Sequence, residues 1–178
     1  MFIDGSNLYH SVKDSFGLHD NEIDFRVLIN FLRKERLMIC IFYYNASLDR
    51  GYNADIYNKQ QKFFAELRRI PDFHVVLCRL KKMKFPNNKV EYTVKGDDIH
   101  LATDLISLAY ENRYDTAIIV SGDGDFVPAI LKAQKLGKKV ETAYFRISCS
   151  SYLKNVCNSS VCLDDYISNI LRKEKQKN

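Results

Sequence analysis

Two aspartates follow a short apolar run in the middle of the chain, in the segment Ser121-Gly122-Asp123-Gly124-Asp125. Residues 116–120 before them are rich in β-branched side chains, which predicts a strand buried on both faces of a parallel sheet. A helix is predicted to follow, because Pro128 falls in its first turn and Gly137 just past its end. Ligands of open α/β sheets bind at the carboxyl ends of the strands. The two carboxylates are therefore predicted to bind a divalent cation there.

A simpler interpretation of these two aspartates is structural. An aspartate before a helix often accepts hydrogen bonds from the N–H groups of the first turn, and Asp-Gly is a common turn dipeptide. That interpretation suits Asp125 alone. However, one cap needs only one carboxylate, and Asp123 stands two residues earlier. The pair therefore favours a metal-binding function.

Acidic residues stand at two further places that the predicted sheet brings to the same edge. Asp4 follows a short strand at the start of the chain, and Asp97 and Asp98 open a long helix. In a doubly wound sheet the first strand lies beside the strand that follows the chain reversal, so these loops are expected to converge. Several carboxylates together make a hard oxygen site for Mg²⁺ or Mn²⁺, ions that clamp a scissile phosphate and activate water.

Each of these residues also has a structural explanation, which the sequence leaves open. Asp4 can cap the turn that follows it, and Asp97 and Asp98 can serve as charges at a helix N-terminus. Ser121 can either orient a carboxylate or serve its own turn.

Two more polar residues are predicted to support the carboxylates. Asn7 can make a local hydrogen bond, although orientation of the acidic cluster is the favoured interpretation. Asp104 lies on the same helical face as Asp97, and either hydrogen-bonds within the cluster or contacts solvent. His100 is interpreted as a structural neighbour instead of a catalytic base.

The elements that position these residues alternate between strand and helix. Strands are predicted over 1–4, 37–44, 73–80, 116–120 and 139–145, with helices between them. This order predicts an α/β fold with about five mostly parallel strands and helices on both faces, which is a three-layer sandwich. One domain is predicted over residues 1–165, followed over 166–178 by the end of the last helix and a basic tail.

A basic hairpin is predicted between the third strand and the long helix. From Arg79 to Lys95 the chain carries six basic residues and one acidic residue, with Phe85 and Tyr92 interleaved. Lysines that contact phosphates and aromatic rings that stack on bases suit a single-stranded nucleic acid. The alternative is a solvated hairpin whose lysines protect the sheet edge from pairing. The lysines assigned to nucleic-acid binding are Lys81, Lys82, Lys84 and Lys95.

Length and composition describe an ordinary globular chain. It has 178 residues, 46% hydrophobic and 28% charged, and its formal net charge of +5 is compatible with a polyanionic partner. No run approaches the roughly 18 apolar residues that a membrane helix needs. No signal peptide, Cys-x-x-Cys pair or phosphate-binding glycine loop is found. We therefore expect a cytoplasmic protein with reduced cysteines and no membrane partner; a homodimer is compatible with the sequence.

The segments that carry these residues together resemble a NYN domain. The matching stretches are residues 2–9 (FIDGSNLY), 95–98 (KGDD), 102–104 (ATD) and 121–126 (SGDGDF), and the resemblance extends from Met1 to about Asp165. More narrowly, they are similar to the LabA-like branch of the PIN-like nuclease superfamily. The resemblance implies a PIN-like fold, an acidic metal centre that uses Mg²⁺ or Mn²⁺, and ribonuclease activity.

The resemblance also assigns roles by motif position. Metal binding falls to Asp4, Asp98, Asp123 and Asp125, and Asn7 supports them in catalysis. The family usually has an apolar residue where Asp97 stands, so Asp97 either adds a ligand or faces solvent. Ser121, Asp97 and Asp104 are thus grouped as supporting residues.

Three functions are compared on this basis. The leading hypothesis is a metal-dependent endoribonuclease that acts on single-stranded or structured RNA. The alternative is a nucleic-acid-binding or regulatory adaptor that keeps the fold but turns over little. A phosphohydrolase of the haloacid dehalogenase type is disfavoured, because that class needs a second aspartate where Ser6 stands.

Overall fold

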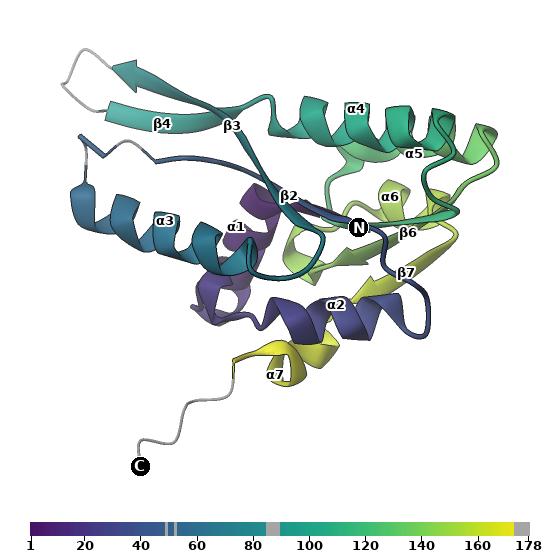
Figure 1. The fold of residues 1–178 in the computed structure, drawn as a ribbon, viewed down its shortest axis with the longest axis horizontal. Helices are drawn as coiled ribbons and strands as arrows, with labels where there is room; N and C mark the ends of the chain where they lie inside the picture. The colour runs from purple at the N-terminus through teal and green to yellow at the C-terminus, as the bar shows by residue number, and fades with distance from the viewer. Residues whose placement is uncertain (49, 52, 85–89, 173–178) are drawn as a thin grey trace.

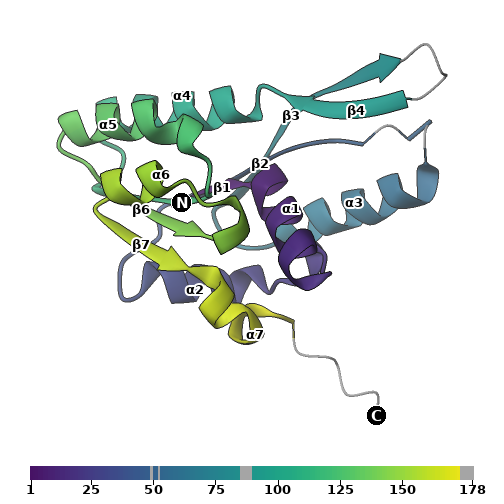
Figure 2. The same ribbon diagram turned by 180° about the vertical axis from the view of Figure 1, so that it is seen from behind.

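A seven-stranded sheet forms the middle of the described chain, and helices cover both of its faces (Figures 1 and 2). The structure is a computed structural model that describes residues 1–48, 50–51, 53–84 and 90–172, with the backbone alone over 79–84 and 90–95. The strands are β1 (Phe2–Asp4), β2 (Ile41–Ala46), β3 (Phe73–Lys84), β4 (Val90–Lys95), β5 (Thr116–Val120), β6 (Lys139–Tyr144) and β7 (Ser159–Cys162).

The α-helices alternate with these strands, as the sequence predicts. They are α1 (Gly5–Phe16), α2 (Phe25–Arg33), α3 (Ala54–Leu67), α4 (Asp97–Tyr110), α5 (Val127–Lys135), α6 (Ser151–Val156) and α7 (Ile167–Ile170). Short 3-10 turns complete the described elements: η1 (Asp20–Glu22), η2 (Gly124–Phe126), η3 (Arg146–Ser148) and η4 (Leu163–Tyr166). Among the described residues, no helix is long and apolar enough to cross a membrane.

The order of the strands puts β1 at the centre of the sheet. Across the sheet the strand order is β4-β3-β2-β1-β5-β6-β7. Every neighbouring pair is parallel except β3 with β4. In this register Ile3 of β1 pairs with Tyr43 of β2 on one side and with Val120 of β5 on the other. The carboxyl ends of β1 and β5 therefore lie side by side, at the switch point that the sequence predicts.

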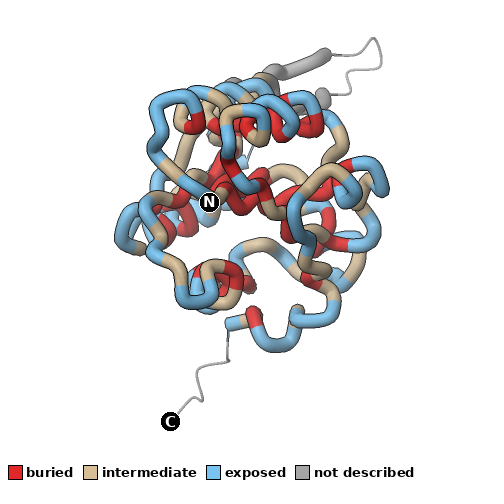
Figure 3. Tube along the Cα trace, turned by 90° about the vertical axis from the view of Figure 1, so that its right-hand side faces the viewer, coloured by how far each residue is buried: buried red, intermediate tan, exposed pale blue. Residues whose placement is uncertain are grey.

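Alternating side chains of the strands build a separate core on each face of the sheet. Ile3 packs among buried residues of α1, α2 and α3. Its neighbour Phe2 packs on the other face, among buried residues of α4, α5 and α6. Figure 3 shows the buried positions concentrated between the layers. The predicted α/β sandwich with helices on both faces is thus confirmed.

The sheet differs from the prediction in its strand count and in one strand boundary. Six strands are parallel instead of about five, because β7 adds an outer strand beside β6. Two exposed serines, Ser159 and Ser160, begin this four-residue strand, so it has no apolar pattern to reveal it. The strand predicted over 37–44 begins only at Ile41, where Phe73 of β3 becomes available as a pairing partner.

β3 and β4 form the hairpin that the sequence predicts. They pair antiparallel from Arg79 with Lys95 to Lys84 with Val90. Figures 1 and 2 show this pair projecting from one end of the sheet, on the way from β3 into α4. Residues 85–89, which connect the two strands, lie outside the described residues.

Candidate metal centre

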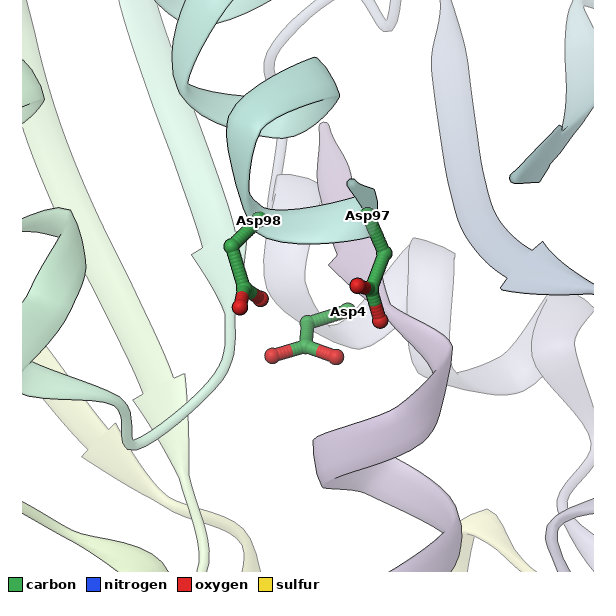
Figure 4. Close-up of side chains that lie close together, drawn as sticks. All are labelled: Asp4, Asp97 and Asp98. Atoms are coloured by element: carbon green, nitrogen blue, oxygen red, sulfur yellow. The ribbon is translucent and has the colours of Figure 1, made fainter. Parts of the chain in front are cut away.

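Three carboxylates meet at the carboxyl edge of the sheet. Asp4 is the last residue of β1, and Asp97 and Asp98 are the first residues of α4. Gly96 allows the sharp entry into α4, since its φ of 89° is a left-handed conformation. One ligand oxygen from each aspartate lies within 4.8 Å of the others, and Figure 4 shows the three side chains gathered at the start of α4. The fold therefore brings together acidic residues from the beginning and the middle of the chain.

Asp4 is the most enclosed of the three, with an exposed fraction of 4%. Its carboxylate accepts hydrogen bonds from the Asn7 backbone N–H at 2.9 Å and from the Ser121 hydroxyl at 3.0 Å. The first of these bonds caps α1, so the capping interpretation also holds. Burial nevertheless raises the pKa of Asp4 to about 7, and the charges of Asp98 and Asp97 contribute to the rise. The two hydrogen bonds do not offset the cost of burying this charge.

Asp97 and Asp98 are adjacent in the sequence but differ in exposure. Asp97 has an exposed fraction of 8%, so it does not face solvent, whereas Asp98 is exposed. Partial burial raises the pKa of Asp98, and the charges of Asp97, Asp123 and Asp125 raise it further. Asp98 is thus under the influence of the buried Asp97 and of the two aspartates that follow β5.

Asp123 and Asp125 lie in the turn after β5, outside the group of three. The Asp123 carboxylate accepts a hydrogen bond from the Asp125 N–H at 2.9 Å and caps η2, while its own N–H donates to the Ser121 hydroxyl at 3.1 Å. Asp125 is exposed. The capping role considered for Asp125 therefore belongs to Asp123. The charges of Asp123 and Asp125 nevertheless raise the pKa of Asp98.

Ser121 and Asn7 fasten the turn after β5 to the start of α1. The Ser121 hydroxyl donates to Asp4. The side-chain oxygen of Asn7 accepts hydrogen bonds from the Gly122 N–H and from the Ser148 hydroxyl, each at 3.2 Å. Ser148, on η3, could not be found from the sequence, because it stands 141 residues from Asn7 and belongs to no motif. Asn7 thus joins three segments at the centre.

The glycines of the same turn allow the segment from η3 into α6 to pack tightly against it. A Cβ at Gly122 would lie 2.3 Å from the backbone oxygen of Ser148, and a Cβ at Gly124 would lie 2.9 Å from the hydroxyl of Ser150. The Ser150 N–H also donates to the Gly122 carbonyl at 2.9 Å. The turn that carries Asp123 is therefore held by backbone contacts that leave no room for a side chain at position 122.

Two buried tyrosines of β2 anchor the elements on opposite faces of the sheet. The Tyr44 hydroxyl donates to Asp104 of α4 at 2.8 Å, and the Tyr43 hydroxyl donates to Asp20 of η1, also at 2.8 Å. Tyr44 pairs with Asp4 in the register of β1 and β2. Asp104 thus ties α4 to β2, a partner that the sequence did not suggest.

The four lysines assigned to nucleic-acid binding lie on the hairpin. Lys81, Lys82 and Lys84 belong to β3 and Lys95 to β4, and their backbone pairing agrees with the predicted hairpin. Their side chains lie outside the described residues. A role for them in nucleic-acid binding stays a prediction.

The donor set of the centre fits a hard divalent cation. Each of the three grouped residues offers a carboxylate oxygen, the ligand that Mg²⁺ and Mn²⁺ favour. Among the described residues, no lysine or arginine forms an ion pair with any of them. Like charges that are buried together repel, and a bound cation offsets that repulsion.

A parallel α/β sandwich with an acidic centre at its switch point is an arrangement of the PIN-like type. The NYN domain family model matches residues 1–164, so the chain belongs to the NYN domain family, within the PIN-like nuclease superfamily. The NYN prediction is confirmed, whereas the narrower LabA-like assignment stays a prediction.

Two similar proteins are themselves without an assigned function. A crystal structure of a protein of unknown function from Vibrio parahaemolyticus RIMD 2210633 has the same fold, with a TM-score of 0.74 and 23% sequence identity over 96% of this chain and 93% of that chain. An uncharacterized protein from Methanocaldococcus jannaschii is 38% identical over 64 residues, which is 35% of this chain and 27% of that protein. The second match thus spans about a quarter of that relative's length.

Proposed function

We propose that this chain is a metal-dependent ribonuclease that hydrolyses internal phosphodiester bonds of single-stranded or structured RNA. The observation that supports this most directly is the meeting of Asp4, Asp97 and Asp98 within 4.8 Å at the switch point of a NYN domain. NYN nucleases generally act on RNA, and a carboxylate cluster is the kind of site that holds a catalytic Mg²⁺ or Mn²⁺.

The proposal gives each residue of the centre a separate task. Asp4 and Asp98, together with Asp123 and Asp125, would hold the cation. The chemistry that a bound cation supplies is neutralisation of charge on the scissile phosphate and activation of a water nucleophile. Ser121 fixes one oxygen of Asp4, and Asn7 fixes the turn that carries Asp123. The hairpin lysines are proposed to hold the RNA backbone.

The test uses labelled single-stranded RNA, double-stranded RNA and single-stranded DNA, each with Mg²⁺, Mn²⁺ or EDTA. RNA should be cleaved only with metal. Asp98→Asn and Asp123→Asn should both abolish cleavage and leave the circular dichroism spectrum unchanged, because an amide is nearly isosteric but a poorer ligand for a hard cation. Asp14→Asn is the matched control, since Asp14 is an exposed residue of α1 outside the centre.

Two results would contradict the proposal. Full metal-dependent cleavage by both centre variants would mean that these aspartates are only caps and turn residues. RNA binding by the wild type without cleavage under any metal condition would favour the adaptor function instead.

A further inference from the structure

Asp97 is a buried carboxylate with no partner among the described residues. The residue is only 8% exposed, yet no described hydrogen-bond donor or cation contacts its carboxylate, whose oxygens keep some solvent contact. Asp4, which is similarly buried, accepts two hydrogen bonds. A charge that is largely withdrawn from water and has no partner is costly. The burial of Asp97 therefore needs an explanation.

The surroundings of Asp97 make the burial more costly still. Figure 4 shows its carboxylate turned toward Asp4, and the ligand oxygens of Asp4, Asp97 and Asp98 lie within 4.8 Å of one another. A negative charge near the N-terminus of α4 is favourable, but the exposed Asp98 already supplies one in the same first turn. The helix dipole therefore does not explain why Asp97 is buried. A cation placed among the three carboxylates would turn the repulsion into attraction.

We infer that Asp97 is an additional metal ligand, which completes with Asp4 and Asp98 a deep position for a divalent cation with oxygen ligands. The inference rests on the proposed function only in that a cation binds at this centre. Asp123 and Asp125 lie outside the group of three, so Asp97 supplies the third carboxylate of the deep position. Affinity for hard divalent cations rises with the number of charged ligands, so Asp97 should strengthen binding of Mn²⁺ and Mg²⁺.

The test is calorimetric titration of the full chain with Mn²⁺ alone at pH 8, without RNA. Asp97→Asn should weaken Mn²⁺ binding at least about tenfold, since even residues that only orient metal ligands contribute factors of about 10–100 to affinity. Asp14→Asn removes the same charge from an exposed site on α1 and should bind Mn²⁺ within about twofold of the wild type. Thermal melting in EDTA checks folding, and Asp97→Asn should melt at or above the wild type because repulsion is relieved.

The outcomes separate this inference from the ribonuclease proposal. Equal Mn²⁺ affinity of Asp97→Asn and the wild type would overturn the inference, and RNA cleavage would still decide the proposed function. Strong destabilisation of Asp97→Asn in EDTA would also overturn it, since Asp97 would then be a structural residue. Weakened Mn²⁺ binding in Asp97→Asn would support the deep position even if the wild type cleaved no RNA.

Discussion

Asp4 experiences two opposing effects, and their balance makes the metal-free centre sensitive to pH. Hydrogen bonds from Asn7 and Ser121 favour its charged form, whereas burial and the neighbouring charges of Asp98 and Asp97 favour its neutral form. Burial is the larger effect, and the pKa rises from 3.8 to about 7. Near neutral pH a fraction of the metal-free molecules therefore carries a protonated Asp4.

The raised pKa of Asp4 predicts that the metal-free protein loses stability as the pH rises. The contribution of Asp4 is fully present below its unfolded pKa of 3.8 and is lost as the pH rises through about 7. Urea unfolding in EDTA, followed from pH 5 to pH 8, should show wild-type stability falling relative to Asp4→Asn, which has no charge to bury. If the stability of the two proteins changed with pH in the same way, the raised pKa of Asp4 would be contradicted.

At the scale of elements, the hydrogen bond between Tyr44 and Asp104 sets the position of α4 against β2. Tyr44→Phe should lower the free energy of unfolding by about 1–3 kcal/mol, because the Asp104 carboxylate loses a hydrogen-bond partner. It should also weaken Mn²⁺ binding, because α4 carries Asp97 and Asp98. Urea unfolding and Mn²⁺ calorimetry measure the two effects.

Tyr43→Phe is the matched control for that variant. It removes a hydroxyl from the opposite face, which donates to Asp20 of η1 instead of α4 and also accepts a hydrogen bond from the Asn45 side chain at 3.2 Å. Its stability should fall by at least as much, because two hydrogen bonds are lost instead of one, with Mn²⁺ affinity retained. If both tyrosine variants weakened Mn²⁺ binding equally, a specific link through α4 would be excluded.

The turn after β5 gives a second prediction at this scale. Gly122→Ala should destabilise the protein by at least about 2 kcal/mol, because its Cβ would lie 2.3 Å from the Ser148 backbone oxygen. Gly124→Ala should cost less, since its Cβ meets the rotatable Ser150 side chain at 2.9 Å. Thermal melts rank the two variants, and the reverse order would mean that η3 does not pack on the turn as described.

These contacts also indicate how much of the molecule the sequence could predict. The aspartates at strand ends, and the convergence of β1 with β5, follow from local patterns and from the rules of parallel sheets. Ser148 and Asp20 could not be found in that way, because their side-chain partners, Asn7 and Ser11 for Ser148 and Tyr43 for Asp20, lie far away in the sequence. The burial of Asp97 was likewise unpredictable, since it depends on how α4 packs against the neighbouring strands and not on its pattern of residues.

For the whole molecule, a cation that binds only the folded state should raise the melting temperature. At a hundredfold excess over the dissociation constant, Mn²⁺ should stabilise the protein by about 2.7 kcal/mol, or roughly 5–11 °C for a domain of this size. Asp98→Asn should lose most of this response. Thermal melts of both proteins in EDTA and in Mn²⁺ measure the difference. A wild-type melting temperature that does not change with Mn²⁺ would argue against a metal centre.

If the lysines of the β3–β4 hairpin contact RNA phosphates, they should make RNA binding depend on salt concentration. Replacing Lys81, Lys82 and Lys84 together with alanine should weaken binding and flatten the plot of log affinity against log salt. Each phosphate contact that is lost should reduce the slope by about 0.7 for a single strand. Filter binding between low and physiological salt measures this slope. An unchanged slope would leave the lysines only the role of protecting the sheet edge.

Residues that contact one another at the metal centre lie far apart in the sequence, and this determines when the centre can form during translation. Ser121 stands 117 residues after Asp4, and Ser148 stands 141 residues after Asn7. A nascent chain that has not yet emerged as far as β5 lacks both the central neighbour of β1 and the turn that fixes Asp4. Because closure of such long loops precedes any gain from the contacts they allow, the acidic centre is assembled late. A chain still on the ribosome, surrounded by RNA, therefore lacks a complete centre until β5 and η3 have been translated.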